Sequence, residues 1–294
     1  MLAAEQPWVG EMIAAGLRTL DVDVRTGVEA VGVEADGEVS TVDLSDGSTW
    51  KGNRLLVASG RRPRTNGLGV EELGITPGDN GELRVDARCH VLTKRGPLAN
   101  TYAIGDVTAT APFTHTANAQ ARAVAGELDG RGRDVQVHAA PRVVYTEPTV
   151  WCIGQNEAGA REAGLRPRTA SFDLGQVERG TLERIQGRFE LIVDERGTVV
   201  DAAAVGPDAD SWAIAAQIAV QQRLDVNVLG DALFAFPTLA EIVGLVARRL
   251  KTPDRPRAST AELGGRRRSG DGPHRLSAAR HDASSQQMDT TEGD

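Results

Sequence analysis

The sequence contains few cysteines and few aromatic residues, and it has no long apolar run. Its 294 residues include only two cysteines, Cys89 and Cys152, and neither has a partner at the spacing of a metal site or a redox motif. These absences exclude a disulfide framework, a zinc cluster and a CxxC centre. We therefore expect two buried, inert thiols and no metal ion.

The chain also lacks the segments that direct a protein to or across a membrane. No stretch of about 18 apolar residues is present, which excludes a transmembrane helix. The first residues, MLAAEQPWVGEM, carry acids where a secretory signal needs a basic and then an apolar segment. These features predict a cytoplasmic protein without a membrane partner.

The sequence also lacks an excess of basic charge, because it contains 33 Lys and Arg but 41 Asp and Glu. Residues 251–294 hold 8 basic and 7 acidic residues, so residues 1–250 carry a net charge of −9. An acidic body argues against a nucleic-acid partner. The last 44 residues have almost no large apolar side chains, and we predict a disordered tail. Its Arg266, Arg267 and Arg268 could touch phosphate or lipid, but a solvated tail is favoured.

The first half of the chain shows a helical pattern and then an alternating one. Apolar spacing predicts a helix from Trp8 to Leu20. Alternation and Asp-Gly pairs then predict short strands and turns. The strands are centred on Val24, Val31 and Val42, and the turns lie at residues 36–37 and 46–47. Two continuous apolar runs, 54–58 and 101–104, predict buried strands, and a helix is expected from His115 to Leu128.

A separate unit is predicted at about 141–250. Its pattern consists of strands and helices in mixed order. The strands are expected at 142–145, 169–174, 189–193 and 199–205, and the helices at 157–163, 211–222 and 239–250.

The most informative segment is Tyr102–Asp106, where a predicted buried strand ends in Gly-Asp. Ligands of parallel α/β sheets lie beyond the carboxyl ends of strands. Gly105 would allow a cofactor to approach closely, and the Asp106 carboxylate could accept hydrogen bonds from ribityl-type hydroxyls. Taken alone, such a pair is more often a plain turn than a ligand site. The helix that follows would direct free N–H groups at negative charge near Asp106, which suits a reduced flavin. His115 at its start is better explained by a local hydrogen bond than by acid/base chemistry.

Five segments in a fixed order now resemble the pyridine nucleotide-disulfide oxidoreductases, flavoproteins that include dihydrolipoamide dehydrogenase, glutathione reductase and mercuric reductase. Together they span most of residues 1–250. The segments are LLVASGRRPRT at 55–65, YAIGD at 102–106, YTEPTV at 145–150, VGPDA at 205–209 and FPTLAE at 236–241.

The resemblance implies FAD and NAD(P) as cofactors. Asp106, after Gly105, would bind the FAD ribityl chain, and the backbone of Thr114, His115 and Ala117 would face the flavin pyrimidine edge. Gly60 and Arg61 would lie on the nicotinamide-nucleotide side. The resemblance also implies a homodimer through residues 138–250, in which the segment ending at Glu241 reaches the partner's active site.

An α/β (α+β) fold follows from the resemblance, with remnants of FAD- and NAD(P)-binding Rossmann-like domains before an α+β dimerisation domain with an antiparallel sheet. Residues 1–53 would be the carboxyl part of the NAD(P)-binding domain, and 54–137 a second segment of the FAD-binding domain. Residues 138–250 would form the dimerisation domain, and 251–294 the tail.

The sequence departs from the family in two ways. Neither GxGxxG loop nor the CxxxxC redox pair is present, so we expect a truncated chain that lacks most of its binding energy for FAD and NAD(P). Phe236 also occupies the position of the acid/base His, and a phenyl ring transfers no protons. Without that His, Glu241 is better explained as a carboxylate in the first turn of a helix than as a catalytic residue.

Two functions are left open. The leading one is an NAD(P)H oxidoreductase that passes electrons through flavin to a small acceptor, which would be a disulfide, a metal ion or a quinone. Because Phe236 replaces the His, mercuric-reductase-like or quinone-reductase-like members are the nearest comparison. The alternative is a non-catalytic dimerisation module, or half of a split enzyme whose separate amino-terminal polypeptide carries the glycine loops.

Overall fold

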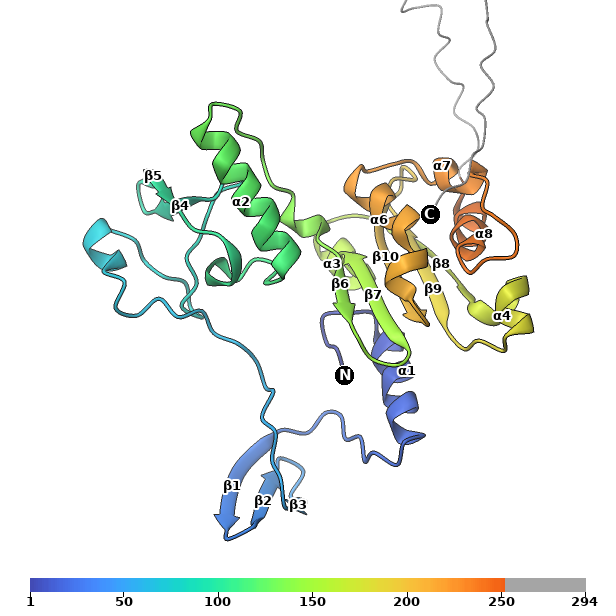
Figure 1. Cartoon of the computed structure of the whole chain (residues 1–294), viewed down its shortest axis with the longest axis horizontal. Coiled ribbons are helices and arrows are strands. Elements are labelled where there is room, and N and C mark those ends of the chain that lie inside the picture. Colours follow the sequence, from blue (N-terminus) through green and yellow to red (C-terminus); the bar gives the residue numbers. More distant parts are fainter. Residues whose placement is uncertain (252–294) are drawn as a thin grey trace, which may run out of the picture. The chain divides into compact units, whose positions relative to one another are not determined.

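The computed structural model describes residues 1–251, which contain three separate antiparallel sheets (Figure 1). The tail predicted at 251–294 lies outside the described residues apart from Lys251, and so do Arg266, Arg267 and Arg268. Among the described residues, no helix is long and apolar enough to cross a membrane.

The largest sheet has five strands in the order β6-β7-β10-β9-β8. The strands are β6 (Arg142–Val144), β7 (Thr149–Gly154), β8 (Arg168–Asp173), β9 (Arg188–Val193) and β10 (Val199–Gly206). All neighbours are antiparallel, and Ala202 at the centre of β10 is opposite both Ile153 and Leu191. An antiparallel sheet in this region was expected, but β7 was not recognised as a strand.

Helices cover one face of this sheet. The elements that contribute buried side chains to the core on this face are α5 (Ala209–Trp212), α6 (Ile214–Gln221), α7 (Val226–Asp231), α8 (Glu241–Leu250) and the 3-10 turns η3 (Val137–Ala139) and η4 (Leu174–Gln176). Helix α4 (Glu178–Leu182) packs against η4, and α3 (Glu157–Glu162) contributes no side chain to this core. Fully buried Phe189 and Leu191 of β9 share a core with Ile242 and Val246 of α8. The helix predicted at 211–222 is in fact two helices, because the backbone leaves the helical conformation at Ala213.

Helix α1 (Pro7–Arg18) covers part of the opposite face. Its Val9 and Ile13 pack with Val150, Cys152 and Ala203 of β7 and β10. The predicted helix is thus confirmed, although it ends two residues earlier than expected. Nothing in the sequence indicated which surface it would cover.

The second sheet has the order β1-β2-β3, with β1 (Ala30–Asp36), β2 (Val39–Leu44) and β3 (Thr49–Gly52). The expected Asp-Gly turns are present, and Gly37 and Gly47 both have positive φ, at 60° and 81°. The strand predicted around Val24 is absent, because this segment has no pairing partner in the described part of the chain.

The buried strand predicted at 54–58 is wrong. This segment has no regular structure, and Leu56 and Val57 are 90% and 72% exposed. An apolar run forms a buried strand only when neighbouring strands pair with it. No strand of the described chain does so here.

Residues 65–137 form a smaller unit around a two-stranded sheet. Its elements are η1 (Val70–Leu73), β4 (His90–Thr93), β5 (Gly96–Tyr102), η2 (Gly105–Thr108) and α2 (Thr114–Leu128). Strand β5 ends at Tyr102 and pairs antiparallel with β4, so the strand expected before Gly105 is not part of a parallel sheet. The helix expected from His115 is confirmed as α2.

Candidate functional site

Asp106 lies on the surface, immediately after the glycine that opens η2. Its carboxylate is 55% exposed, and its Oδ2 lies 3.1 Å from Nη1 of Arg61. Gly105 has a φ of 75°, which is in the left-handed region that favours glycine. The turn therefore presents a carboxylate with most of its hydrogen-bonding capacity free for a ligand.

Helix α2 holds this turn in place through Gln120. The buried Gln120 side chain accepts a 2.7 Å hydrogen bond from the backbone N–H of Gly105. A Cβ built on Gly105 would lie 3.5 Å from that of Ala117, so the turn packs directly on the first turns of α2. Sequence reasoning missed Gln120. A long polar side chain four residues after buried Thr116, on the same face of the helix, was the available signal.

The start of α2 offers free donors. Phe113 precedes the helix without a capping side-chain hydrogen bond, and the Oγ1 of Thr116 is buried without a hydrogen-bond partner among the described residues. The backbone N–H groups of the first turn, at Thr114 and His115 among others, are unpaired by helix geometry. This end of α2 therefore carries partial positive charge and suits an electron-rich ligand.

The His115 side chain contributes to structure. Its Nε2 lies 2.9 Å from the carbonyl oxygen of Pro141, to which it can donate, and its ring stacks on Phe113 with centroids 5.2 Å apart. These contacts tie α2 to the chain that enters β6. A ring held in this way agrees with the local hydrogen bond favoured from the sequence over acid/base chemistry.

Gly60 and Arg61 follow the exposed run at 54–58. Gly60 has a φ of 142°, and no atom lies within 4 Å of a Cβ built on it. The structure thus brings Arg61, Asp106, Gly105 and the start of α2 together. In the sequence, Arg61 belongs to a different segment from Gly105 and Asp106.

Glu241 belongs to a different part of the chain. It is the first residue of α8, and its Oε2 accepts a 3.0 Å hydrogen bond from the backbone N–H of Thr238. This is a capping contact at the start of a helix. Phe236, five residues earlier, is 72% exposed.

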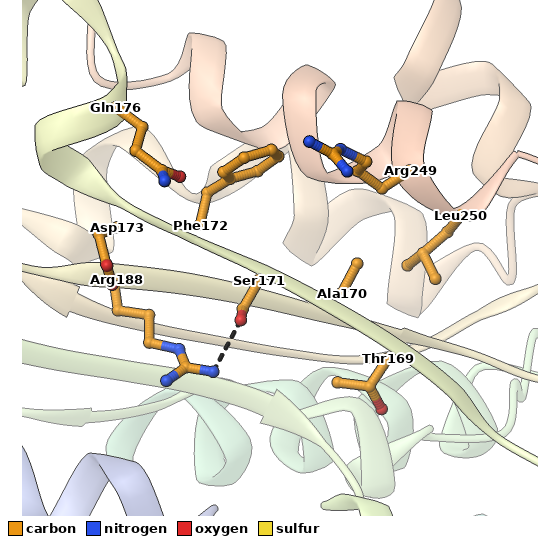
Figure 2. Close-up of a pocket in the computed structure, with 9 residues that line it drawn as sticks. All are labelled: Thr169, Ala170, Ser171, Phe172, Asp173, Gln176, Arg188, Arg249 and Leu250. Carbon is orange, nitrogen blue, oxygen red and sulfur yellow. Dashed lines mark hydrogen bonds between the residues drawn. The ribbon is translucent and has the colours of Figure 1, made fainter.

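Two hollows of the described chain lie in the region of the five-stranded sheet. One of about 320 Å³ adjoins the start of α2 and is lined by Thr114, His115, Tyr145 and Asp210, among others. Another of about 580 Å³ surrounds edge strand β8 (Figure 2). There Phe172 and Arg249 lie on one side of the strand, and Ser171 and Arg188 on the other. None of the predicted site residues lines the second hollow.

Both cysteines are free and buried, as expected. Burial raises the pKa of the Cys89 thiol, and it raises that of Cys152 much further. Neither thiol is therefore a ready nucleophile. Residues 1–251 contain no group of three or more His, Cys, Asp or Glu side chains placed to hold a metal ion.

Comparison with protein families identifies two matching regions. Residues 1–123 match the pyridine nucleotide-disulphide oxidoreductase family, and residues 140–247 match the dimerisation domain of the same family. The first match ends within α2 and the second begins just before β6, with residues 124–139 between them.

Individual relatives agree with this result. The chain is 32% identical to a dihydrolipoyl dehydrogenase from Staphylococcus aureus over 211 residues, which is 71% of this chain and 42% of that protein. It is also 32% identical to a mercuric reductase from Streptomyces lividans over 246 residues, 80% of this chain and 51% of the other.

Solved structures show the same fold. LpdA from Mycobacterium tuberculosis superposes with a TM-score of 0.74 at 25% identity, covering 84% of this chain and 54% of that one. An HOCl-induced flavoprotein disulfide reductase from Escherichia coli gives 0.70 at 25% identity, covering 85% and 57%. The chain thus spans about half the length of the proteins it matches.

Proposed function

Because the chain belongs to the pyridine nucleotide-disulfide oxidoreductase family, we propose that it is the carboxyl-terminal part of an FAD-dependent NAD(P)H oxidoreductase. Family members such as lipoamide dehydrogenase and mercuric reductase are FAD- and NAD(P)-dependent flavoproteins. The observation that carries the proposal is the exposed Asp106 carboxylate, held by the Gly105–Gln120 hydrogen bond against the first turns of α2.

The residues present fit a flavin nucleotide. The Asp106 carboxylate can accept hydrogen bonds from ribityl hydroxyls, and the free N–H groups of Thr114 and His115 can donate to the oxygens of the flavin pyrimidine ring. Gly105 keeps the backbone clear for close approach. When bound, FAD would supply two-electron redox chemistry, and this chain's residues would bind and orient it.

The domain assignment follows from the same proposal. Residues 1–53 would complete an NAD(P)-binding domain, and residues 54–137 an FAD-binding domain, with Gly60 and Arg61 toward the nicotinamide nucleotide. The dimerisation-domain match supports a homodimer through residues 138–250. Exposed apolar side chains are available there for an interface. They include Ile214, Ile218, Val228, Leu233 and Phe236.

The residues of the FPTLAE segment, 236–241, indicate which class of electron acceptor the enzyme uses. Phe236 cannot shuttle protons, and Glu241 is engaged by the Thr238 N–H, so this segment offers no His-Glu dyad for thiol chemistry. A small acceptor that needs no such dyad, a metal ion or a quinone, therefore fits better than a disulfide. We propose that the enzyme is cytoplasmic, as its composition predicts.

The second candidate function is a non-catalytic dimerisation module or half of a split enzyme. It is favoured by the exposed run at 54–58 and by the absence of a GxGxxG loop from the sequence. In this case the chain would bind flavin only together with another polypeptide.

Replacing Asp106 tests the leading proposal. We expect Asp106→Ala to weaken FAD binding by about tenfold or more, because a charge-assisted hydrogen bond is worth roughly 1.5–3 kcal/mol. The measurement is the flavin absorption that co-elutes with protein on a size-exclusion column, with added FAD. Asp129→Ala is the matched control, because Asp129 is another exposed carboxylate paired with an arginine, at the far end of α2. Full flavin retention by the Asp106 variant would refute the assignment.

A further inference from the structure

Strand β8 lies at one edge of the five-stranded sheet, and its outer side has no partner strand. Within the described chain it pairs with β9 alone. The N–H of Leu174 donates to the carbonyl oxygen of Gly187 at 2.9 Å, which fixes the alternation of the antiparallel ladder. Alternate residues of β8 therefore direct their backbone N–H and C=O groups away from the sheet. These residues are Thr169, Ser171 and Asp173.

This free edge has the geometry that a further strand needs. Its segment RTASFD contains no proline, and the pairing with β9 runs without a bulge from Arg168 to Asp173. Prolines and bulges are among the features that keep an edge from accepting another strand. The edge also lines the hollow of about 580 Å³ shown in Figure 2, together with Arg249 and Leu250 at the end of α8. The outward backbone groups are therefore available to an extended chain.

Two arginines flank the edge, one on each side of the strand (Figure 2). The Cζ of Arg249 lies 5.1 Å from the centroid of the Phe172 ring. On the other side, Nη2 of Arg188 donates to Oγ of Ser171 at 2.7 Å and lies 3.6 Å from Oε2 of Glu190. Each guanidinium group is thus held beside the edge by its neighbours.

The lining of the hollow is basic, although the chain as a whole has a net charge of −8. Its two arginines are accompanied by one acid, Asp173, at the end of the strand. Arg249 is exposed and takes part in no ion pair within residues 1–251. An extended chain directs alternate side chains to the two faces of a sheet, so its carboxylates can reach both arginines. A small anion on either face would meet only the guanidinium group on that face.

We propose that β8 binds an extended acidic segment of another protein, which adds to the sheet as a sixth strand and places carboxylates beside both Arg188 and Arg249. The outward groups of β8 would supply main-chain hydrogen bonds, which any strand could accept. The charge-assisted bonds to the two arginines would select an acidic segment. This surface is separate from the proposed flavin site, since neither Asp106 nor any residue of α2 lines the hollow.

Charge favours an acidic segment over a second copy of the chain. Two β8 strands paired antiparallel would bring the Arg188 groups of both copies together on one face and the Arg249 groups on the other. Like charges placed across an interface are unfavourable. Self-pairing of β8 is therefore the main competing outcome of the tests below.

Binding of designed peptides to the full chain tests the charge requirement. The probe is a blocked, fluorescently labelled peptide TVETTEVT, whose two glutamates lie three positions apart and hence on opposite faces of a strand. Its affinity, measured by anisotropy, should exceed that of TVKTTKVT by about tenfold or more. It should exceed that of TVETETVT, which has the same composition but both glutamates on one face, by about threefold. Equal affinities for the three peptides would refute the proposal.

A matched pair of arginine variants tests the position of the site. Arg249→Gln should weaken binding of TVETTEVT by about fivefold, the upper range for a partly exposed ion pair. Arg223→Gln is the control, because Arg223 is also exposed and lies outside the hollow, after α6. Both side chains are exposed, so both variants should fold. Equal binding by the two variants would place the peptide elsewhere and overturn the proposal.

Amide hydrogen exchange of the full chain distinguishes strand addition from loose charge attraction. Saturation with TVETTEVT should slow exchange at Thr169, Ser171 and Asp173 by about tenfold or more, because these amides gain hydrogen bonds. Exchange at Ala170 and Phe172, which already bond to β9, should change little. The same change in both sets, or none, would refute strand addition. Outward amides already protected in the free chain would also refute it, and dependence of that protection on protein concentration would identify a second copy as the occupant.

Discussion

The five-stranded sheet of residues 140–250 and the three-stranded sheet of β1–β3 differ in how their faces are covered. The first has helices on one face and α1 on part of the other, and Phe189 and Leu191 are fully buried. The second has one open apolar face beside an unpaired run. One region is thus covered by other elements of the described chain, and the other leaves apolar side chains of one face exposed. Most of the free energy of unfolding should therefore come from the first.

The largest expected effect is a core substitution in the covered region. Phe189 is fully buried and makes an edge-to-face contact with Trp212, with centroids 6.0 Å apart. Phe189→Ala should lower the free energy of unfolding by about 3–5 kcal/mol because it removes a packed ring and leaves a cavity. Urea unfolding of the full chain measures this loss.

Val33→Ala in β1 is the comparison, because Val33 lies on the open face. It should cost no more than about 0.5 kcal/mol, as is typical of exposed positions. Similar losses for the two variants would contradict the contrast between the regions.

A smaller effect is expected where α1 is attached to the covered sheet. The Glu5 carboxylate accepts hydrogen bonds from Nε and Nη2 of Arg142 at 2.7 and 2.8 Å, and both side chains are largely buried. Glu5→Gln leaves the guanidinium without its counter-charge and should cost about 1.5–3 kcal/mol. Faster hydrogen exchange in α1 would show its release from the sheet.

Glu11→Gln is the matched control, because Glu11 is an exposed glutamate on α1 itself. The same exchange rates in wild type and Glu5→Gln would show that apolar packing alone holds α1. In that event the Glu5–Arg142 ion pair would contribute less to the attachment of α1 than its short distances indicate.

The sequence predicted the covered region better than the open one for a physical reason. Strands β8, β9 and β10 carry apolar side chains that pair within the described chain, so local pattern and tertiary context agree. The run at 54–58 has an equally strong pattern, but no neighbour in this chain pairs with it. Strand β7 was missed because only its first two residues lie in the YTEPTV motif, and the apolar continuity of the TVWCIG segment was overlooked.

The candidate site was predictable in its residue types but not in its contacts. The Gly-Asp pair and the start of α2 could be identified from the order of segments. The Arg61–Asp106 pair joins residues 45 positions apart, and Gln120 reaches back to Gly105 across a turn. Such contacts depend on how η2 packs on α2, which no local pattern specifies. Whether these residues bind cofactor stays a prediction.

The last prediction concerns pH and the face of the five-stranded sheet on which α1 packs. Asp201 of β10 is 2% exposed, and its Oδ1 has no hydrogen-bond partner among residues 1–251. Burial raises its pKa well above the usual 3.8, against the opposing effect of Arg142, while Glu190 and Glu5 add to the increase. Burial likewise raises the pKa of Glu190.

A raised carboxyl pKa makes the folded state hold a proton that the unfolded chain has lost. The contribution of this protonated carboxyl group to the free energy of unfolding is fully present below pH 3.8, the unfolded-state pKa. It declines as the pH rises toward the folded-state pKa, by at most about 1.4 kcal/mol per pH unit. Asp201→Asn should therefore flatten the decline in unfolding free energy as the pH rises above the unfolded-state value of 3.8, with a residual slope from Glu190. Asp36→Asn, at an exposed position of β1, should leave the slope unchanged. A slope that persists in full in the Asp201 variant would contradict the prediction and assign the pH dependence to other groups, Glu190 among them.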